Sequence, residues 1–202
     1  MKTTAEALQD TFAAYVGHMC GNLTYLEIGA AWPDHYSTSC VLDTVLGWKG
    51  FSVEYNPNYQ LNWQTHTARN NLCFFENALG INYSKIADIL NLSKHMGYLS
   101  CDIEPPQQTF QALQRVLAQG FQFDCITFEH DAYYDTNNFE TLAREFLTTQ
   151  GYKVAVTDVY PLHMPNCHFE TWFVKDHVQF PQMSFEQYRQ FITQHEFFQT
   201  II

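Results

Sequence analysis

Three residues at the ends of two predicted strands have the types and the spacing expected of a ligand-binding crevice. Glu27 and Gly29 close the first predicted strand, and Glu54 closes the second. Carboxylates accept hydrogen bonds from hydroxyl and ammonium groups, and a glycine lets the chain turn close to a ligand without a Cβ clash. Since neighbouring parallel strands end at the same edge of a sheet, these residues predict a nucleotide-shaped crevice there.

The apolar runs that position these residues alternate with helical patterns along the chain. Strands are expected at Leu23–Ile28, Phe51–Tyr55, Leu72–Glu76, Gly97–Cys101, Phe123–Phe128, Tyr152–Thr157 and His168–Val174, and helices at Thr4–Gly17, Pro33–Leu46, Pro57–Arg69, Ser84–Leu92, 105–120 and Asn137–Thr149. Helices between strands indicate right-handed βαβ units, whereas the last two strands have no helix between them. The prediction is an α/β, Rossmann-like fold with a mostly parallel seven-stranded sheet, helices on both faces and an antiparallel C-terminal hairpin at one edge.

The single glycine at the first turn favours one class of nucleotide cofactor over another. The three-glycine motif that binds a dinucleotide pyrophosphate is absent, which argues against a nicotinamide cofactor. S-adenosylmethionine has no phosphate, and its ribose diol needs a carboxylate that Glu54 can supply. Glu27 either orders the turn or attracts the ammonium of the methionine moiety, directly or through water.

The composition of the chain indicates which classes of partner it can bind and in which compartment it works. The net charge of −11 favours a ligand with a sulfonium and an ammonium, and it argues against a nucleic-acid partner, which needs a basic patch. None of the six cysteines stands in a CxxC pair, so we expect reduced core thiols rather than a zinc knuckle. With no signal peptide and no run of membrane-spanning length, we expect a cytoplasmic protein without membrane association.

Several blocks between Leu23 and Asp176 resemble, in order, the motifs of the FkbM family of methyltransferases. They are YLEIGA, GWKGFSVEYNP, YLSCDIE, FDCITFEHD and the closing ETWFVKD. The resemblance implies a Rossmann-like methyltransferase fold, S-adenosylmethionine as cofactor and methyl transfer to oxygen. Two positions depart from the family: Tyr55 replaces a proline after the ribose acid, and Pro105-Pro106-Gln107 replaces the usual Gly-Ala-Glu.

The residues and the resemblance together define an expected cofactor-binding set. It comprises Glu27, Gly29, Ala30, Glu54, Tyr55, Ala78 and Asp102.

Polar residues at the fourth and fifth strand ends are candidates for catalysis. Asp102 could contact the methionine end of the cofactor, and Glu104 or His130 could be the general base that removes a hydroxyl proton. Alternatively, Asp102, Glu129 and His130 could hold a divalent metal such as magnesium, although two acids and a histidine at strand tips also arise by chance. A structural hydrogen bond that orders the loop is the other role open to His130.

The expected organisation is a methyltransferase domain at 1–176 followed by an aromatic-rich helical appendage at 177–202. The appendage is expected to dock on its own domain or, as a second choice, to form a homodimer contact. The predicted function is S-adenosylmethionine-dependent O-methylation of a small-molecule or sugar hydroxyl. A non-catalytic cofactor-binding partner subunit and a nicotinamide-dependent oxidoreductase remain as alternatives.

Overall fold

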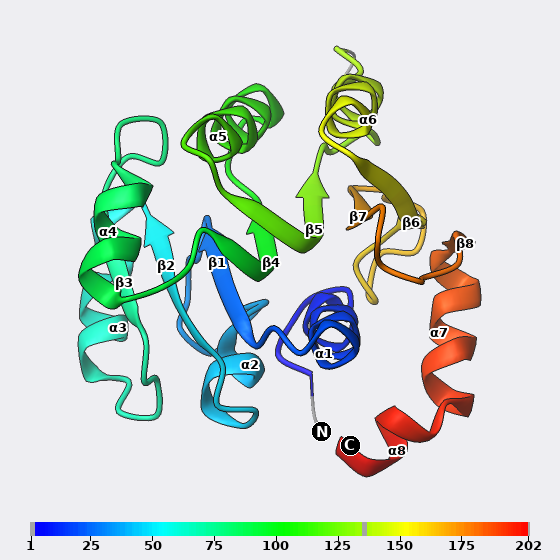
Figure 1. Cartoon of the computed structure of the whole chain (residues 1–202), viewed down its shortest axis with the longest axis horizontal. Helices are drawn as coiled ribbons and strands as arrows, with labels where there is room; N and C mark the ends of the chain where they lie inside the picture. Colours follow the sequence, from blue (N-terminus) through cyan, green and yellow to red (C-terminus); the bar gives the residue numbers. More distant parts are fainter. Residues whose placement is uncertain (1–2, 135–136, 202) are drawn as a thin grey trace.

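An eight-stranded sheet forms the centre of the computed structural model, which describes residues 3–134 and 137–201 (Figure 1). The strand order is β3-β2-β1-β4-β5-β7-β6-β8. The strands are β1 Thr24–Ile28, β2 Lys49–Glu54, β3 Leu72–Phe75, β4 His95–Cys101, β5 Gln122–Glu129, β6 Tyr152–Val159, β7 Glu170–Lys175 and β8 Met183–Ser184. Strands β1 to β5 run parallel to one another, which confirms the predicted mostly parallel sheet.

The C-terminal strands differ from the prediction in two respects. β6 and β7 pair antiparallel as expected, but β7 lies between β5 and β6, so the pair is not a simple edge hairpin. The predicted count of seven strands is wrong because β8 adds a two-residue parallel pairing to β6. A strand of two residues is too short to produce a recognisable alternation in the sequence.

Helices cover both faces of the sheet, as predicted (Figure 1). They are α1 Gln9–Cys20, α2 Cys40–Thr44, the 3-10 helix η1 Pro57–Tyr59, α3 Gln60–Thr65, α4 Tyr83–Leu90, α5 Pro106–Ala118, α6 Phe139–Thr149, α7 Phe185–Gln194 and α8 Glu196–Ile201. One core layer lies between the sheet and α4, α5 and α6, and the other lies between the sheet and α1, α2 and α7. None of the described helices is long and apolar enough to span a membrane.

Local signals explain where several helices begin and end. The first helix continues past Gly17 and ends at Gly21, which adopts the left-handed conformation that suits a glycine C-cap. Gly17 instead makes room for the ring of Trp48, since a Cβ there would lie 2.3 Å from it. The predicted helix at Ser84–Leu92 begins one residue earlier, at Tyr83, and the side chain of Asn82 caps it by accepting from the Lys85 N–H.

The aromatic tail packs against its own domain. Phe185 and Tyr188 of α7 are fully buried in the same core layer as Phe12 of α1. The hydroxyls of Tyr188 and Thr11 lie 2.9 Å apart. The boundary at 176/177 and the homodimer contact stay predictions, and Ile202, the last residue of the predicted appendage, lies outside the described residues.

The register of three parallel strands sets the level of the site. Ile28 of β1 pairs with Val53 of β2 and with Cys101 of β4, so the next residue of each strand lies in one row. These next residues are Gly29, Glu54 and Asp102. The sheet therefore brings the first two predicted strand tips and the fourth to the same edge.

Gly29 is required by the neighbouring strand. It has a φ of +86°, and a Cβ built on it would lie 1.5 Å from the carbonyl oxygen of Asp102. Its N–H donates to the carbonyl of Val53 at 2.9 Å. The glycine thus allows β1 to turn between β2 and β4. A side chain at this position would force the ends of β1 and β4 apart.

Replacing Gly29 by alanine should therefore cost far more stability than its backbone conformation alone predicts. Gly120 is a matched control because its φ is +88° while the nearest atom to its Cβ would be 3.8 Å away. Gly120→Ala should lower the free energy of unfolding by about 1–2 kcal/mol, and Gly29→Ala by more than about 3 kcal/mol. Urea denaturation of both variants measures the difference; equal losses would contradict the close-approach explanation.

Candidate functional site

A cleft of about 550 Å³ opens at the carboxyl ends of β1, β2 and β4. This is where the strand order reverses, because β1 lies between β2 and β4, and it is the usual ligand position in such sheets. The cleft is lined by Gly29, Ala31, Val53, Glu54, Tyr55, Asn56, Tyr59, Asn77, Ala78, Asp102, Ile103, Glu104 and Gln108. Polar groups of both the cofactor-binding and the catalytic predictions therefore converge on one cavity.

Glu54 is held rigidly at the cleft by backbone donors. The N–H of Ala31 donates to Oε2 at 2.7 Å, and the N–H of Asn56 donates to Oε1 at 2.6 Å. Each carboxylate oxygen can accept a second hydrogen bond. Although Glu54 is only 8% exposed, it lines the cleft and can still accept from a ligand.

Glu27 lies below the cleft and orders a loop instead of lining the cavity. Its two carboxylate oxygens accept from backbone or hydroxyl donors of Ser37, Thr38 and Ser39, and from the Ser52 hydroxyl. Two roles were predicted for Glu27: ordering the turn or attracting the ammonium of the cofactor. These contacts are those of a residue that orders the turn. They also explain why the predicted helix at Pro33–Leu46 is reduced to α2, since the chain before it wraps around the carboxylate.

Arg69, which no sequence motif indicates, completes this buried network. Its guanidinium donates to Asp43 Oδ2 at 2.9 Å and to Ser39 Oγ at 2.8 Å, and it lies 4.0 Å from Glu27 Oε2. The ring of Trp63 stacks 4.4 Å from it. The loop between β1 and α2 is therefore fixed by buried charges contributed from three separate segments.

Five members of the expected cofactor-binding set line the cleft, and two do not. Gly29, Glu54, Tyr55, Ala78 and Asp102 line it. The expected Ala30 is buried and does not line the cleft, because it turns away while Ala31 faces the cavity. Asn77 was missed; it is the second residue after β3, and a search for polar side chains near strand ends would have found it.

Asp102 is the most electrostatically perturbed acid in the cleft. Burial raises the pKa of Asp102 well above its ordinary range, and the nearby carboxylates of Glu170, Asp131 and Glu104 raise it further. These charges repel one another when ionised. A cation bound beside Asp102 would relieve this repulsion, so this end of the cleft favours a positively charged group.

The two base candidates occupy different surroundings. Glu104 is exposed in the cleft, with its Oε2 atom 3.0 Å from the hydroxyl of Tyr134. His130 is buried: its Nδ1 atom accepts from the Ala132 N–H at 3.1 Å, and its Nε2 atom lies 3.1 Å from the Thr171 hydroxyl. His130 lines a separate hollow of about 180 Å³, so its contacts are those of a residue that orders the loop.

The structure does not assemble the expected magnesium site from Asp102, Glu129 and His130. Asp102 and His130 line different cavities. Among residues 3–134 and 137–201, only one group of three His, Cys, Asp or Glu side chains brings its ligand atoms within 4.8 Å of one another. That group lies elsewhere in the fold and contains none of Asp102, Glu129 and His130. Asp102 follows β4, whereas Glu129 and His130 stand at the end of β5, one strand farther from the cleft.

Comparison with known proteins identifies the fold but no family. No family model and no curated protein matches the sequence. Fibrillarin from Aeropyrum pernix, solved with natively bound S-adenosyl-L-methionine, is 15% identical over 76% of this chain and 66% of its own, with a TM-score of 0.53. An rRNA methylase from Streptococcus thermophilus is 11% identical over 87% and 98%, with a TM-score of 0.50.

A human methyltransferase 10 domain containing protein is also similar, with 11% identity over 88% of this chain and 84% of its own and a TM-score of 0.53. Likeness at these identities establishes a Rossmann-like methyltransferase fold. The resemblance to the FkbM family stays a prediction.

Glu170, in the hollow beside His130, should make the stability of the protein depend on pH. Glu170 is 1% exposed there and accepts from Trp172 Nε1 at 2.7 Å and from Gln9 Nε2 at 3.1 Å. Burial outweighs these two bonds and raises the pKa of Glu170 to about 7. Because the folded state then binds this proton more tightly than the unfolded chain does, stability from this group is present at low pH and is lost as the pH rises through about 7.

Glu170→Gln should remove that loss. Between about pH 5 and pH 8, the variant's free energy of unfolding should fall by roughly 2–3 kcal/mol less than that of the unaltered protein. Urea denaturation at both pH values tests this, since other titrating groups affect both proteins alike. Parallel pH profiles would show that Glu170 titrates normally.

Proposed function

We propose that the protein is an S-adenosylmethionine-dependent methyltransferase that methylates a hydroxyl oxygen of a small molecule or sugar. The observation that supports this most strongly is Glu54, a carboxylate fixed by two backbone N–H groups at the tip of β2 and facing the cleft. A ribose diol presents two adjacent donors that such a carboxylate can accept. The bound S-adenosyl-L-methionine of the similar fibrillarin structure supports the same cofactor here.

The distribution of charge along the cleft supports one orientation of the cofactor. With the ribose on Glu54, we assign the adenine to the β3 side, beside Asn77 and Ala78, where no acid lines the cavity. The methionine end then lies toward Gly29 and Asp102. Its ammonium and sulfonium would lie beside Asp102 and Glu104, the two acids that line this end of the cleft, so opposite charges attract there.

Glu104 is the group we assign to the acceptor. It lies in the same cleft as Asp102 but is exposed, and Tyr134 holds one of its oxygens. Bound S-adenosylmethionine would supply a methyl group on its sulfonium, which leaves as S-adenosylhomocysteine. Glu104 would take the proton of the acceptor hydroxyl whose oxygen replaces the sulfur on that methyl carbon. Alignment of the acceptor with the methyl group supplies much of the rate, and the base supplies a further part. His130 positions the loop that carries Tyr134 rather than touching the reactants.

A small acceptor fits the charge of the protein better than a nucleic acid does. The net charge of −11 and the acids at the cleft would repel phosphates. The resemblance to FkbM enzymes supports oxygen as the methylated atom. The rRNA methylase shares the fold at 11% identity, which does not bear on the acceptor.

Glu54→Ala should weaken binding of S-adenosylhomocysteine by at least about 10-fold, because each charge-assisted hydrogen bond to the ribose contributes about 1.5–3 kcal/mol. Isothermal titration calorimetry measures the affinity, and thermal unfolding checks that the Ala31 turn survives. Glu145→Ala, which removes an exposed acid of α6, is the matched control and should bind normally. Undiminished affinity in Glu54→Ala would remove the ribose assignment, and stronger stabilisation by NAD than by S-adenosylhomocysteine would favour the oxidoreductase alternative.

Glu104→Gln should lower turnover by about 100-fold or more, since it keeps the shape of the side chain and removes its basicity. Its affinity for S-adenosylhomocysteine should stay unchanged. A methyl-release assay over sugars, polyketide hydroxyls and small acids first identifies an acceptor and then compares the variants. Full turnover in Glu104→Gln would exclude it as the base, and binding of cofactor without turnover on any acceptor would favour the non-catalytic subunit.

A further inference from the structure

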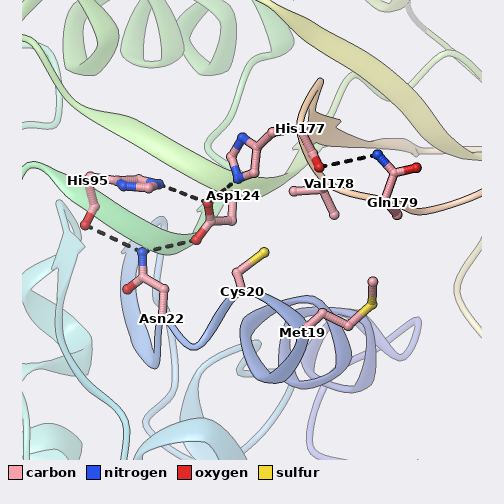
Figure 2. Close-up of a pocket in the computed structure, with 8 residues that line it drawn as sticks. All are labelled: Met19, Cys20, Asn22, His95, Asp124, His177, Val178 and Gln179. Carbon is pink, nitrogen blue, oxygen red and sulfur yellow. Dashed lines mark hydrogen bonds and ion pairs between the residues drawn. The ribbon is translucent and has the colours of Figure 1, made fainter.

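A second pocket, of about 400 Å³, lies where β4 and β5 begin, at the end of these strands away from the cleft. Figure 2 shows the side chains that line it. Cys20 is the last residue of α1, Asp124 is near the start of β5, and His177 follows β7. His95 begins β4 and pairs in the sheet with Gln122. The pocket therefore combines side chains from four elements that are far apart in the sequence.

The side chains in this pocket converge on one buried carboxylate. Asp124 is 1% exposed, and its Oδ1 atom lies 2.8 Å from His95 Nε2 and 3.3 Å from His177 Nε2. Its Oδ2 atom accepts from Asn22 Nδ2 at 3.0 Å. The thiol of Cys20 points into the same pocket, and the ligand atoms of Cys20, Asp124 and His177 all lie within 4.8 Å of one another (Figure 2).

We propose that Cys20, Asp124 and His177 bind a divalent transition-metal ion, with Zn²⁺ as the best match. A thiolate, an imidazole nitrogen and a carboxylate oxygen are the three donor types that zinc accepts, whereas calcium and magnesium require oxygen ligands. Nitrogen and oxygen ligands of tetrahedral zinc, each bonded at about 2.0–2.1 Å, lie about 3.3 Å from each other. His177 Nε2 and Asp124 Oδ1 already have that separation.

Hydrogen bonding of Asp124 alone does not account for this arrangement. Asn22 and His95 already supply a donor to each oxygen of the carboxylate. His177 nevertheless reaches the same Oδ1 atom from the turn after β7, and Cys20 places a third donor atom beside them. A cation bound between Cys20, Asp124 and His177 would neutralise the buried carboxylate. It would also give the thiol a ligand role, since the thiol takes no part in the ion pairs between Asp124 and the two histidines.

Asn22 and His95 serve as the outer groups of this site. Their contacts with Asp124 orient the carboxylate, as outer hydrogen-bond partners do in known metal sites. The ion would tie the end of α1 and the turn after β7 to the sheet, and the open side of the pocket gives it a path from solvent and a position for water. The site has three protein ligands and is separate from the cleft where methyl transfer is proposed.

Titration of tag-free, fully reduced full-length protein with Zn²⁺ tests the proposal. Calorimetry should show one equivalent bound with sub-micromolar affinity, and Zn²⁺ should raise the unfolding temperature until a chelator is added. Cys20→Ser and His177→Ala should each weaken binding by more than about 100-fold, and His95→Ala by about 10- to 100-fold. Cys167→Ser and His163→Ala, which change residues of the 161–168 loop, should bind Zn²⁺ as the unaltered protein does.

Co²⁺ provides a readout that needs no variant. The Co²⁺-loaded protein should show a thiolate-to-cobalt charge-transfer band and the visible spectrum of a tetrahedral site, and the band should vanish in Cys20→Ser. Absence of stoichiometric binding, a cobalt spectrum without thiolate, or tight binding that persists in both Cys20→Ser and His177→Ala would overturn the assignment. Affinity for S-adenosylhomocysteine should be the same in all these variants, so failure here would be separate from failure of the proposed function.

Discussion

The close approach of β1 to β4 at Gly29 is the constraint on which the rest of the site depends. Because a Cβ there would lie 1.5 Å from the Asp102 carbonyl oxygen, the chain can turn at this level only with a glycine. The turn brings the Ala31 N–H to the Glu54 carboxylate, which fixes the acid at the tip of β2. The close contact of Gly29 with the Asp102 carbonyl places Asp102 on the other side of Gly29 from Glu54. One glycine therefore sets the relative positions of the two acids that we assign to the ribose and to the methionine moiety of the cofactor.

Acids in similar sequence positions acquire different roles because their surroundings differ. Glu27 and Glu54 both stand near strand ends, yet Glu27 points into the packed loop before α2 and meets six hydroxyl or backbone hydrogen bonds and a buried arginine. Glu54 meets two and still faces the cavity. Burial and, after it, the neighbouring acids raise the pKa of Asp102. The cleft thus has a neutral-ligand end and a cation-favouring end.

The alternation of strands and helices was sufficient to predict the parallel sheet, the antiparallel C-terminal pair and the location of the cleft. The sequence could not reveal that β7 enters between β5 and β6, since strand order depends on packing between distant segments. Nor could it reveal which way a strand-tip side chain points: Ala30 and Ala31 differ by one residue, and the turn decides which faces the cavity. Arg69 and the cluster around Asp124 were invisible for the same reason. Their partners come from separate elements, without a spacing that a motif could describe.

A crystal structure of the protein with S-adenosylhomocysteine tests the central claim most directly, because it locates the ribose and the sulfur independently of activity. The account predicts the ribose hydroxyls within hydrogen-bonding distance of Glu54, the amino group beside Asp102, and the sulfur facing the side of the cleft that carries Glu104. A ligand bound elsewhere on the protein, or bound in the cleft with its ribose away from Glu54, would contradict it.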